Sequence, residues 1–181
     1  MRIARARHSP HMSDNRTWIA LLALSAAGLV GIAVDEGYTQ RAVPDPVKGT
    51  AVPTLGFGTT GGVKMGDSTT PVKALVRKLS DVQGFEGALK ACVQVPLHQA
   101  EYDAYINLAY NIGPAAFCKS TLVRRLNTLD YAGACDAILM WRRVGSTDCS
   151  EPGNHTCPGL WARRQRLHAQ CLGNPATEGT P

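Results

Sequence analysis

The chain has 181 residues, of which 44% are hydrophobic, and a formal net charge of +5. This apolar content can bury a core and excludes a chain that is disordered throughout, while the length excludes a multidomain machine and allows one modest domain with an appendage. Four arginines against one aspartate give residues 1–16 a net charge of +3, and residues 35–181 carry only +2. A nucleic-acid-binding protein needs a dense basic face on its folded body, so this distribution argues against that class.

The first expected element is the uncharged, apolar segment 17–34. As one helix it would measure about 27 Å, close to the roughly 30 Å of a bilayer core. The arginines ahead of it should hold the N-terminus in the cytoplasm, so the chain after Val34 is expected on the far side of the membrane. We therefore expect residues 1–34 to form a signal-anchor segment.

Two other interpretations of this segment stay open. A cleaved signal peptide is one, because Ser25-Ala26-Ala27 offers small residues at a cleavage position. A buried core helix is the other, although it does not explain the arginine cluster. If the segment is an anchor it is a weak one, since eight of its 18 residues are Ala, Gly or Ser. A weak anchor can insert and later leave the bilayer.

The cysteines support an exported body, because all six follow the apolar segment and their number is even. Zinc binding is disfavoured, since the chain has no Cys-x-x-Cys pair and the five histidines form no convincing cluster. Spacing alone suggests only one disulfide, between Cys149 and Cys157, and leaves the other pairings open.

The body is expected to be one domain at 35–172, followed by a short polar tail at 173–181. Residues 44–66 are rich in Gly, Pro, Thr and Val, which predicts short strands and tight turns. The cap Ser68-Thr69-Thr70 and Pro71 then predict a helix, with apolar residues at Val72, Leu75, Val76 and Leu79.

A second helix is expected from Pro96, with an apolar side and an end before Gly113-Pro114. Similar spacing predicts helical segments near 119–127, 130–141 and 159–172. The fold class is therefore α+β, mainly α, with a small β-hairpin beside a helical lobe.

The chemistry is expected to rest on carboxylates, because the sequence shows no nucleophile elbow and no phosphate-binding loop. Glycoside hydrolysis needs one protonated carboxyl and a second, ionised group. Glu36 and Asp45 are the candidates, although Glu36 could merely end the apolar helix and Asp45 could merely shape a turn between two prolines. Thr54 on its own is an ordinary strand residue.

Several motifs in order along the body resemble phage-type lysozymes, glycoside hydrolase family 24. They are Glu36-Gly37-Tyr38, Asp45-Pro46-Val47, Thr54-Leu55-Gly56-Phe57-Gly58, Tyr110-Asn111-Ile112-Gly113, the stretch 116–127, Gly133-Ala134-Cys135-Asp136, Trp141 and Gly159-Leu160-Trp161-Ala162-Arg163-Arg164. The leader is similar to the signal-arrest-release (SAR) segment of some endolysins of this family.

The resemblance implies a lysozyme-like fold and a muramidase that hydrolyses the β-1,4 bond between N-acetylmuramic acid and N-acetylglucosamine in peptidoglycan, to lyse the host at the end of a phage cycle. It implies that Glu36 is the general acid, that Asp45 orients or activates water and that Thr54 helps to hold this water. A lytic transglycosylase and a non-catalytic wall-binding protein are the alternatives. No cofactor or metal is expected, and we expect a monomer that partners peptidoglycan and no nucleic acid.

Two departures from the family pattern affect the site. Many relatives have His where this chain has Thr59, so the contact of that His is expected to be absent or replaced, and Thr59 is treated as structural. The interval from Asp45 to Thr54 is longer than in the shortest members, with a wider turn at Lys48-Gly49-Thr50. This makes Thr50 the nearest rival of Thr54.

The resemblance also implies a disulfide between Cys92 and Cys118, which leaves Cys135 with Cys171. Because no cysteine lies in 1–34, activation by a thiol that leaves the membrane is not available. The expected control is physical. While residues 17–34 stay in the inner membrane, Glu36 is kept from its cleft, and exit to the periplasm assembles the site.

Overall fold

The computed structural model describes residues 15–45 and 49–173. The leader arginines Arg2, Arg5 and Arg7, Lys48 of the wide turn and the tail beyond Gly173 lie outside the described residues. The helices are α1 Ala26–Glu36, α2 Pro71–Cys92, α3 Gln99–Ile112, α4 Pro114–Cys118, α5 Thr121–Asn127, α6 Tyr131–Asp136 and α7 Pro158–Cys171. The strands are β1 Thr39–Asp45, β2 Gly49–Gly56, β3 Arg143–Val144 and β4 Thr147–Asp148. The α+β, mainly α class is confirmed.

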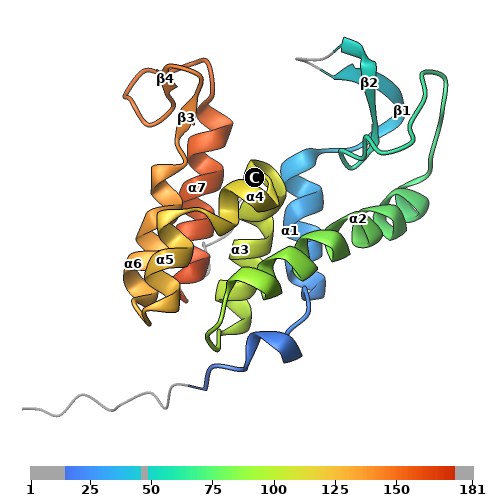
Figure 1. The fold of residues 1–181 in the computed structure, drawn as a ribbon. Coiled ribbons are helices and arrows are strands. Elements are labelled where there is room, and N and C mark those ends of the chain that lie inside the picture. Colours follow the sequence, from blue (N-terminus) through green and yellow to red (C-terminus); the bar gives the residue numbers. More distant parts are fainter. Residues whose placement is uncertain (1–14, 46–48, 174–181) are drawn as a thin grey trace, which may run out of the picture.

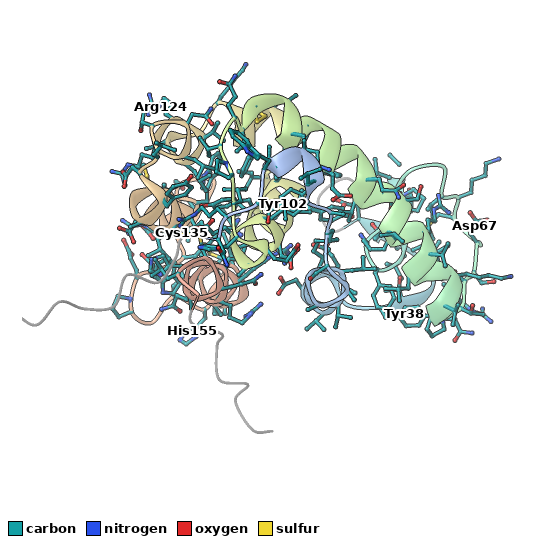
Figure 2. The ribbon with its side chains drawn as sticks, turned by 90° about the horizontal axis from the view of Figure 1, so that it is seen from below. Tyr38, Asp67, Tyr102, Arg124, Cys135 and His155 are labelled. Atoms are coloured by element: carbon teal, nitrogen blue, oxygen red, sulfur yellow. A yellow bond between two sulfur atoms is a disulfide. The ribbon has the colours of Figure 1, made fainter. Side chains whose placement is uncertain are left out.

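Helix α3 lies at the centre of the helical lobe and packs against α1, α2, α4 and α7 (Figure 1). Its side chains Tyr102, Tyr105, Ile106 and Leu108 are fully buried. The hairpin of β1 and β2 lies beside the N-terminal end of α2 (Figure 1). Figure 2 accordingly shows Tyr38 at the end of the molecule opposite to Arg124. Glu36, the candidate acid at the end of α1, therefore lies between the helical lobe and the hairpin.

The start of α3 differs from the sequence prediction. The helix begins at Gln99 rather than at Pro96, because Leu97 is extended and exchanges two backbone hydrogen bonds of 2.8 Å with Thr17. His98 is the N-cap residue, and its N–H donates to the carboxylate of Glu101 over 2.8 Å. The predicted end before Gly113-Pro114 is confirmed.

Other helices are confirmed with changed detail. Thr70 caps α2, with Pro71 in the first turn, as expected. The segment predicted near 119–127 is α5, which begins at Thr121 because the Ser120 side chain accepts from the Val123 N–H and starts a new helix after α4. The segment 130–141 is α6 followed by a 3-10 helix, Ala137–Met140.

The periodic apolar residues of α2 do not form its buried face. Val72 is 74% exposed and Val76 is 65% exposed, whereas Ala74, Lys78 and Val82 are buried. The spacing of apolar residues predicts the helix, but it does not show which face of the helix packs against the core. A lysine consequently occupies the core side of this helix.

The three disulfides that the resemblance and the local spacing suggest are all present. Cys92–Cys118 joins α2 to α4, Cys135–Cys171 joins α6 to α7, and Cys149–Cys157 closes the loop before α7. Helices α6 and α7, which are far apart in sequence, are thereby held together. Such crosslinks suit an exported protein.

The expected single helix over 17–34 is wrong for this structure. The segment contains a short 3-10 helix, Ile19–Leu21, and then α1, which crosses the expected boundary between residues 34 and 35. The chain turns between them because the N–H groups of Leu24 and Ser25 donate to the carboxylates of Glu86 and Asp103, over 2.7 and 3.0 Å. Among the described residues, no helix is long and apolar enough to cross a membrane.

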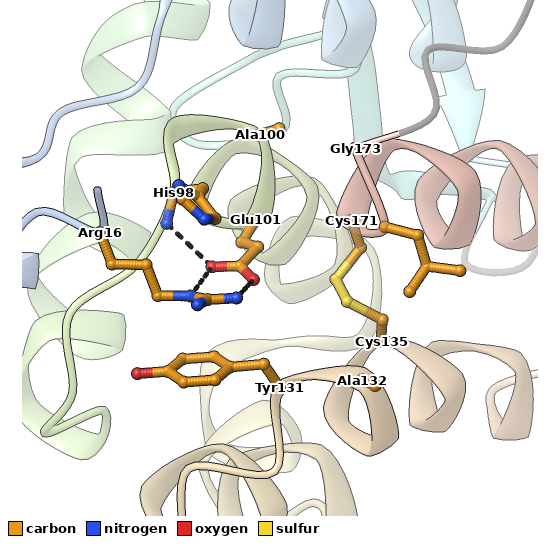
Figure 3. A pocket seen from close by; sticks show the side chains of 10 residues that line it. Arg16, His98, Ala100, Glu101, Tyr131, Ala132, Cys135, Cys171 and Gly173 are labelled. Carbon is orange, nitrogen blue, oxygen red and sulfur yellow. Dashed lines mark hydrogen bonds and ion pairs between the residues drawn. A yellow bond between two sulfur atoms is a disulfide. The ribbon is translucent and has the colours of Figure 1, made fainter. Parts of the chain in front are cut away.

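The leader is also fastened to the body ahead of this turn (Figure 3). The Arg16 guanidinium donates two hydrogen bonds to the Glu101 carboxylate, of 3.1 and 2.8 Å, and its carbon lies 3.6 Å from the ring centre of Tyr131. Glu101 is only 3% exposed, so this bidentate ion pair is largely shielded from water. The last arginine of the leader thus belongs to the folded body.

Candidate active site

Glu36 is the last residue of α1, and its neighbour Asp35 precedes it on the same helical turn. The helix ends here because Gly37 adopts a φ of +69°, which redirects the chain into β1. The Asp35 side chain is 9% exposed and the Glu36 side chain 22%. The helix end therefore presents one nearly buried carboxylate and one that reaches solvent.

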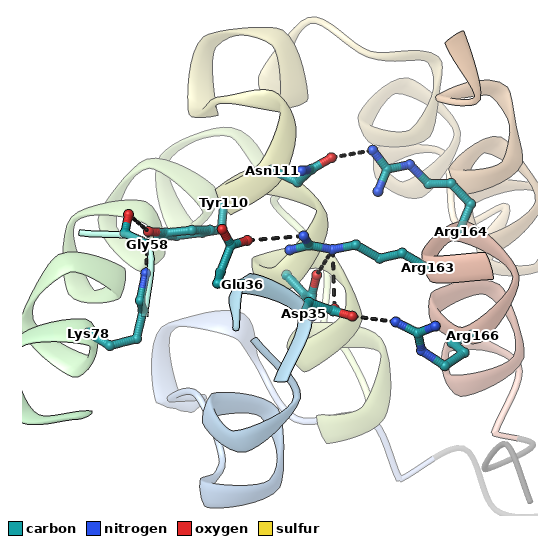
Figure 4. A network of polar contacts seen from close by, with 10 residues as sticks. Asp35, Glu36, Gly58, Lys78, Tyr110, Asn111, Arg163, Arg164 and Arg166 are labelled. Carbon is teal, nitrogen blue, oxygen red and sulfur yellow. Dashed lines mark hydrogen bonds and ion pairs between the residues drawn. The ribbon is translucent and has the colours of Figure 1, made fainter. Parts of the chain in front are cut away.

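Arg163 of α7 holds both carboxylates (Figure 4). Its Nη1 donates to Glu36 Oε1 over 3.0 Å, and its Nε lies 3.2 Å from Asp35 Oδ2. Asn107 of α3 donates to the same Asp35 oxygen over 3.0 Å, and Arg166 pairs with the other oxygen. Helices α1, α3 and α7 are thereby connected through the two acids, which fixes the position of Glu36.

Replacing Arg163 by Met should destabilise the fold, because it leaves two partly buried carboxylates without their shared cation. We expect a loss of about 3 kcal/mol in the free energy of unfolding, measured by denaturant titration. Arg166→Met is the matched control, since Arg166 pairs with Asp35 but is 51% exposed. It should cost less than about 1 kcal/mol. Equal losses in the two variants would contradict this account.

The adjacent Arg164 makes contacts that stabilise the fold. Its side chain is buried, Nε donates to the Trp141 carbonyl over 2.8 Å, and Nη2 donates to Asn111. Burial, with a smaller contribution from the charge of Arg163, lowers the pKa of Arg164 to about 10. This second arginine braces α7 against the end of α3 and the 3-10 helix, and does not reach Glu36.

The turn after β2 lies against the Glu36 carboxylate. Gly58 has a φ of +76°, and a side chain there would place its Cβ 2.9 Å from Glu36 Oε2. Glycine is therefore required for both reasons, conformation and space. The hairpin is positioned on the acid by this contact, although the two are 22 residues apart.

Asp45 and Thr54 lie on the paired strands of this hairpin. Asp45 ends β1 and pairs with Gly49, and Thr54 of β2 pairs with Val43, with an irregularity in the register between the two pairs. Both are half-buried, whereas the rival Thr50 is exposed. The structure thus brings Asp45 and Thr54 to one hairpin and connects that hairpin to Glu36 through the short link 37–38 and the Gly58 turn.

Thr59 has a defined partner in place of the family histidine. It is 3% exposed, and its Oγ1 donates to Asp81 Oδ2 over 2.5 Å. Its backbone N–H and carbonyl also bond to Leu55, over 3.1 and 2.9 Å. A neutral hydroxyl therefore joins the hairpin turn to α2 at this position.

Five further residues around Glu36 belong to the site in the structure. The sequence does not single out Asn107, Lys78 or Asp35 as part of the site, and Tyr110 and Arg163 stand out only as members of motifs. Burial, followed by the Glu36 charge, raises the pKa of Tyr110 to about 12, so its hydroxyl stays protonated and neutral. The double arginine of the motif was the available signal for Arg163, whereas no spacing singles out Asn107 or Lys78.

The chain is similar to known proteins over most of its length. The phage lysozyme family model matches residues 33–166. The endolysin of Salmonella phage P22 is 35% identical over 130 residues, which cover 69% of this chain and 87% of that protein. The SAR-endolysin of Pseudomonas phage phiKMV is 36% identical over 156 residues, covering 84% and 89%. The crystal structure of a P22 lysozyme mutant superposes with a TM-score of 0.72 at 34% identity, covering 84% of this chain and 99% of that one.

Proposed function

Because the chain belongs to the phage lysozyme family, and is thus a peptidoglycan-hydrolysing endolysin, we propose that Glu36, Asp45 and Thr54 carry its reaction. The observation that supports this most directly is the placement of Glu36, which Arg163 and the Gly58 turn hold beside the hairpin of Asp45 and Thr54. Glycoside hydrolysis requires a fixed general acid together with groups that hold or activate water.

In the proposed reaction Glu36 gives its proton to the glycosidic oxygen as the bond from C1 of N-acetylmuramic acid to that oxygen breaks. A water held by Asp45 and Thr54 attacks C1 and passes a proton to Asp45. The products are a reducing N-acetylmuramic acid end and a free 4-hydroxyl on N-acetylglucosamine. Exchange with solvent then returns the proton to Glu36.

Digestion of purified peptidoglycan in H₂¹⁸O should distinguish the two possible reactions on this bond. Hydrolysis places one ¹⁸O in each new muramic acid end, which mass spectrometry detects after reduction of that end to the alcohol. A transglycosylase would give an anhydro end without solvent oxygen. Anhydro products, or products without the label, would contradict the roles of Asp45 and Thr54.

We also propose that residues 17–34 first hold the enzyme in the host inner membrane, with the domain in the periplasm, and that it acts after release. The similarity to a SAR-endolysin supports this. If the segment spans the bilayer, Arg16 is cytoplasmic while Glu101 is periplasmic, about 30 Å away. Their ion pair, 2.8 Å in this structure, belongs to a state in which the leader has left the membrane.

The contacts of the leader explain why the tethered enzyme would be inactive. Asp103 accepts from both the N–H and the hydroxyl of Ser25, which also caps α1. A spanning segment removes Ser25 from this carboxylate, and the helix that carries Glu36 loses its anchor on α3. The catalytic acid then lacks a fixed position relative to the hairpin, and a monomeric enzyme forms its site only after release.

A further inference from the structure

Lys78 is buried in the core side of α2, with no exposed surface. Lysine is almost never buried in this way unless its ammonium is paired or hydrogen-bonded. The exposed face of the same helix carries Val72 and Val76. The helix therefore directs a cation inward and aliphatic side chains outward, which costs free energy and calls for a functional reason.

The ammonium of Lys78 is connected to the catalytic candidate through two neighbours (Figure 4). Nζ donates to the Tyr110 hydroxyl and lies 4.1 Å from the centre of that ring. The Tyr110 hydroxyl donates to the Gly58 carbonyl over 3.4 Å. Gly58 is the residue whose backbone lies against the Glu36 carboxylate. A series of contacts thus runs from Lys78 through Tyr110 and the Gly58 turn to Glu36.

Charged groups of three helices face Lys78. Burial lowers the pKa of its ammonium, the carboxylates of Glu36 on α1 and Asp81 on α2 oppose this, and Arg163 on α7 lowers the pKa further. On α3, Tyr110 is neutral. Glu36 therefore lies between two basic side chains, Arg163 at hydrogen-bond distance and Lys78 behind Tyr110.

We propose that Lys78 is a positioning residue for the general acid: by donating to Tyr110, whose hydroxyl donates to the Gly58 carbonyl, it fixes the Gly58 turn against the Glu36 carboxylate. This rests on the proposed role of Glu36. Without Lys78 the Tyr110 hydroxyl loses a buried partner and the turn is held less firmly, so Glu36 is less accurately placed for proton transfer.

The test is to measure kcat and KM separately for Lys78→Met and Lys78→Gln, with soluble peptidoglycan fragments as substrate. Met cannot donate to the Tyr110 hydroxyl, whereas Gln keeps a polar contact for it. We expect kcat to fall about 10-fold or more in Lys78→Met and less in Lys78→Gln, with KM nearly unchanged, because misplacement of a catalytic group slows the chemical step. Lys73→Met on the exposed side of α2 should keep the wild-type kcat.

A wild-type kcat in folded Lys78 variants would overturn the inference, as would a change in KM alone or an equal loss of kcat in Lys73→Met. If Lys78→Met does not fold, the Gln variant decides. The failure of the underlying roles is recognised separately: an active Glu36→Gln enzyme contradicts the proposed function, whereas an inactive one together with a wild-type kcat in the Lys78 variants contradicts this inference alone.

Discussion

Glu36→Gln should lower muralytic activity at least about 10³-fold while leaving the fold intact. Gln has the shape of Glu and its carbonyl oxygen can still accept from Arg163, but its amide cannot supply the proton that the leaving oxygen needs. General acid catalysis contributes about 10² to 10⁴ in rate. The measurement is release of reducing ends from peptidoglycan, with denaturant unfolding of the same sample.

Asp35→Asn is the matched control, since the two acids are adjacent and share Arg163. Asp35 has its charge buried against Arg163 and Arg166, so its neutralisation should cost about 2 to 3 kcal/mol in the free energy of unfolding. Its variant should retain most of the activity below the unfolding transition. A Glu36→Gln enzyme that cleaves peptidoglycan at the wild-type rate would remove Glu36 from the mechanism.

Local signals predicted much of the fold. Thr70 followed by Pro71 marked the start of α2, and Gly113 marked the end of α3, because caps and turns depend on residues near in sequence. The pairing of Cys135 with Cys171 came from the resemblance to a family, since spacing left it open.

The errors arise where distant residues decide local structure. Pro96 did not start a helix because Leu97 pairs with Thr17, about 80 residues away. The apolar leader does not form one helix because Glu86 and Asp103 accept from its backbone. No window of the sequence contains both partners of these contacts, so periodicity could not reveal them.

In the candidate site, too, residues close in sequence could be predicted and distant ones could not. Glu36, Asp45 and Thr54 could be identified from motifs because they lie within 19 residues of one another. Arg163, which positions Glu36, is 127 residues away. Lys78 carries no signal, because a lysine at one position of an amphipathic helix normally faces solvent. Catalytic groups were thus predictable in this chain, whereas the groups that position them required the fold.

Replacing Ala26, Ala27 and Gly31 together by Leu should keep the enzyme in the membrane and delay lysis. These substitutions make insertion of the apolar segment about 2 kcal/mol more favourable. The released fold should tolerate them, because Ala26 and Ala27 are exposed and a side chain at Gly31 meets nothing within 4 Å. Gly28 is left unchanged, since a Cβ there would lie 2.8 Å from Asp103 Cγ and would itself disturb docking.

The measurement is the fraction of enzyme in the inner membrane and the time of lysis, after expression of the full chain in a Gram-negative host. The same three positions changed to Ser are the matched control, which should weaken the anchor and advance lysis. Activity of the purified Leu variant on isolated peptidoglycan separates trapping from damage, because a trapped enzyme is active once it is out of the bilayer. Lysis on the wild-type schedule, with the Leu variant in the periplasm, would show that the anchor does not control the enzyme. The docking of Arg16 on Glu101 would then be a structural contact without a role in timing.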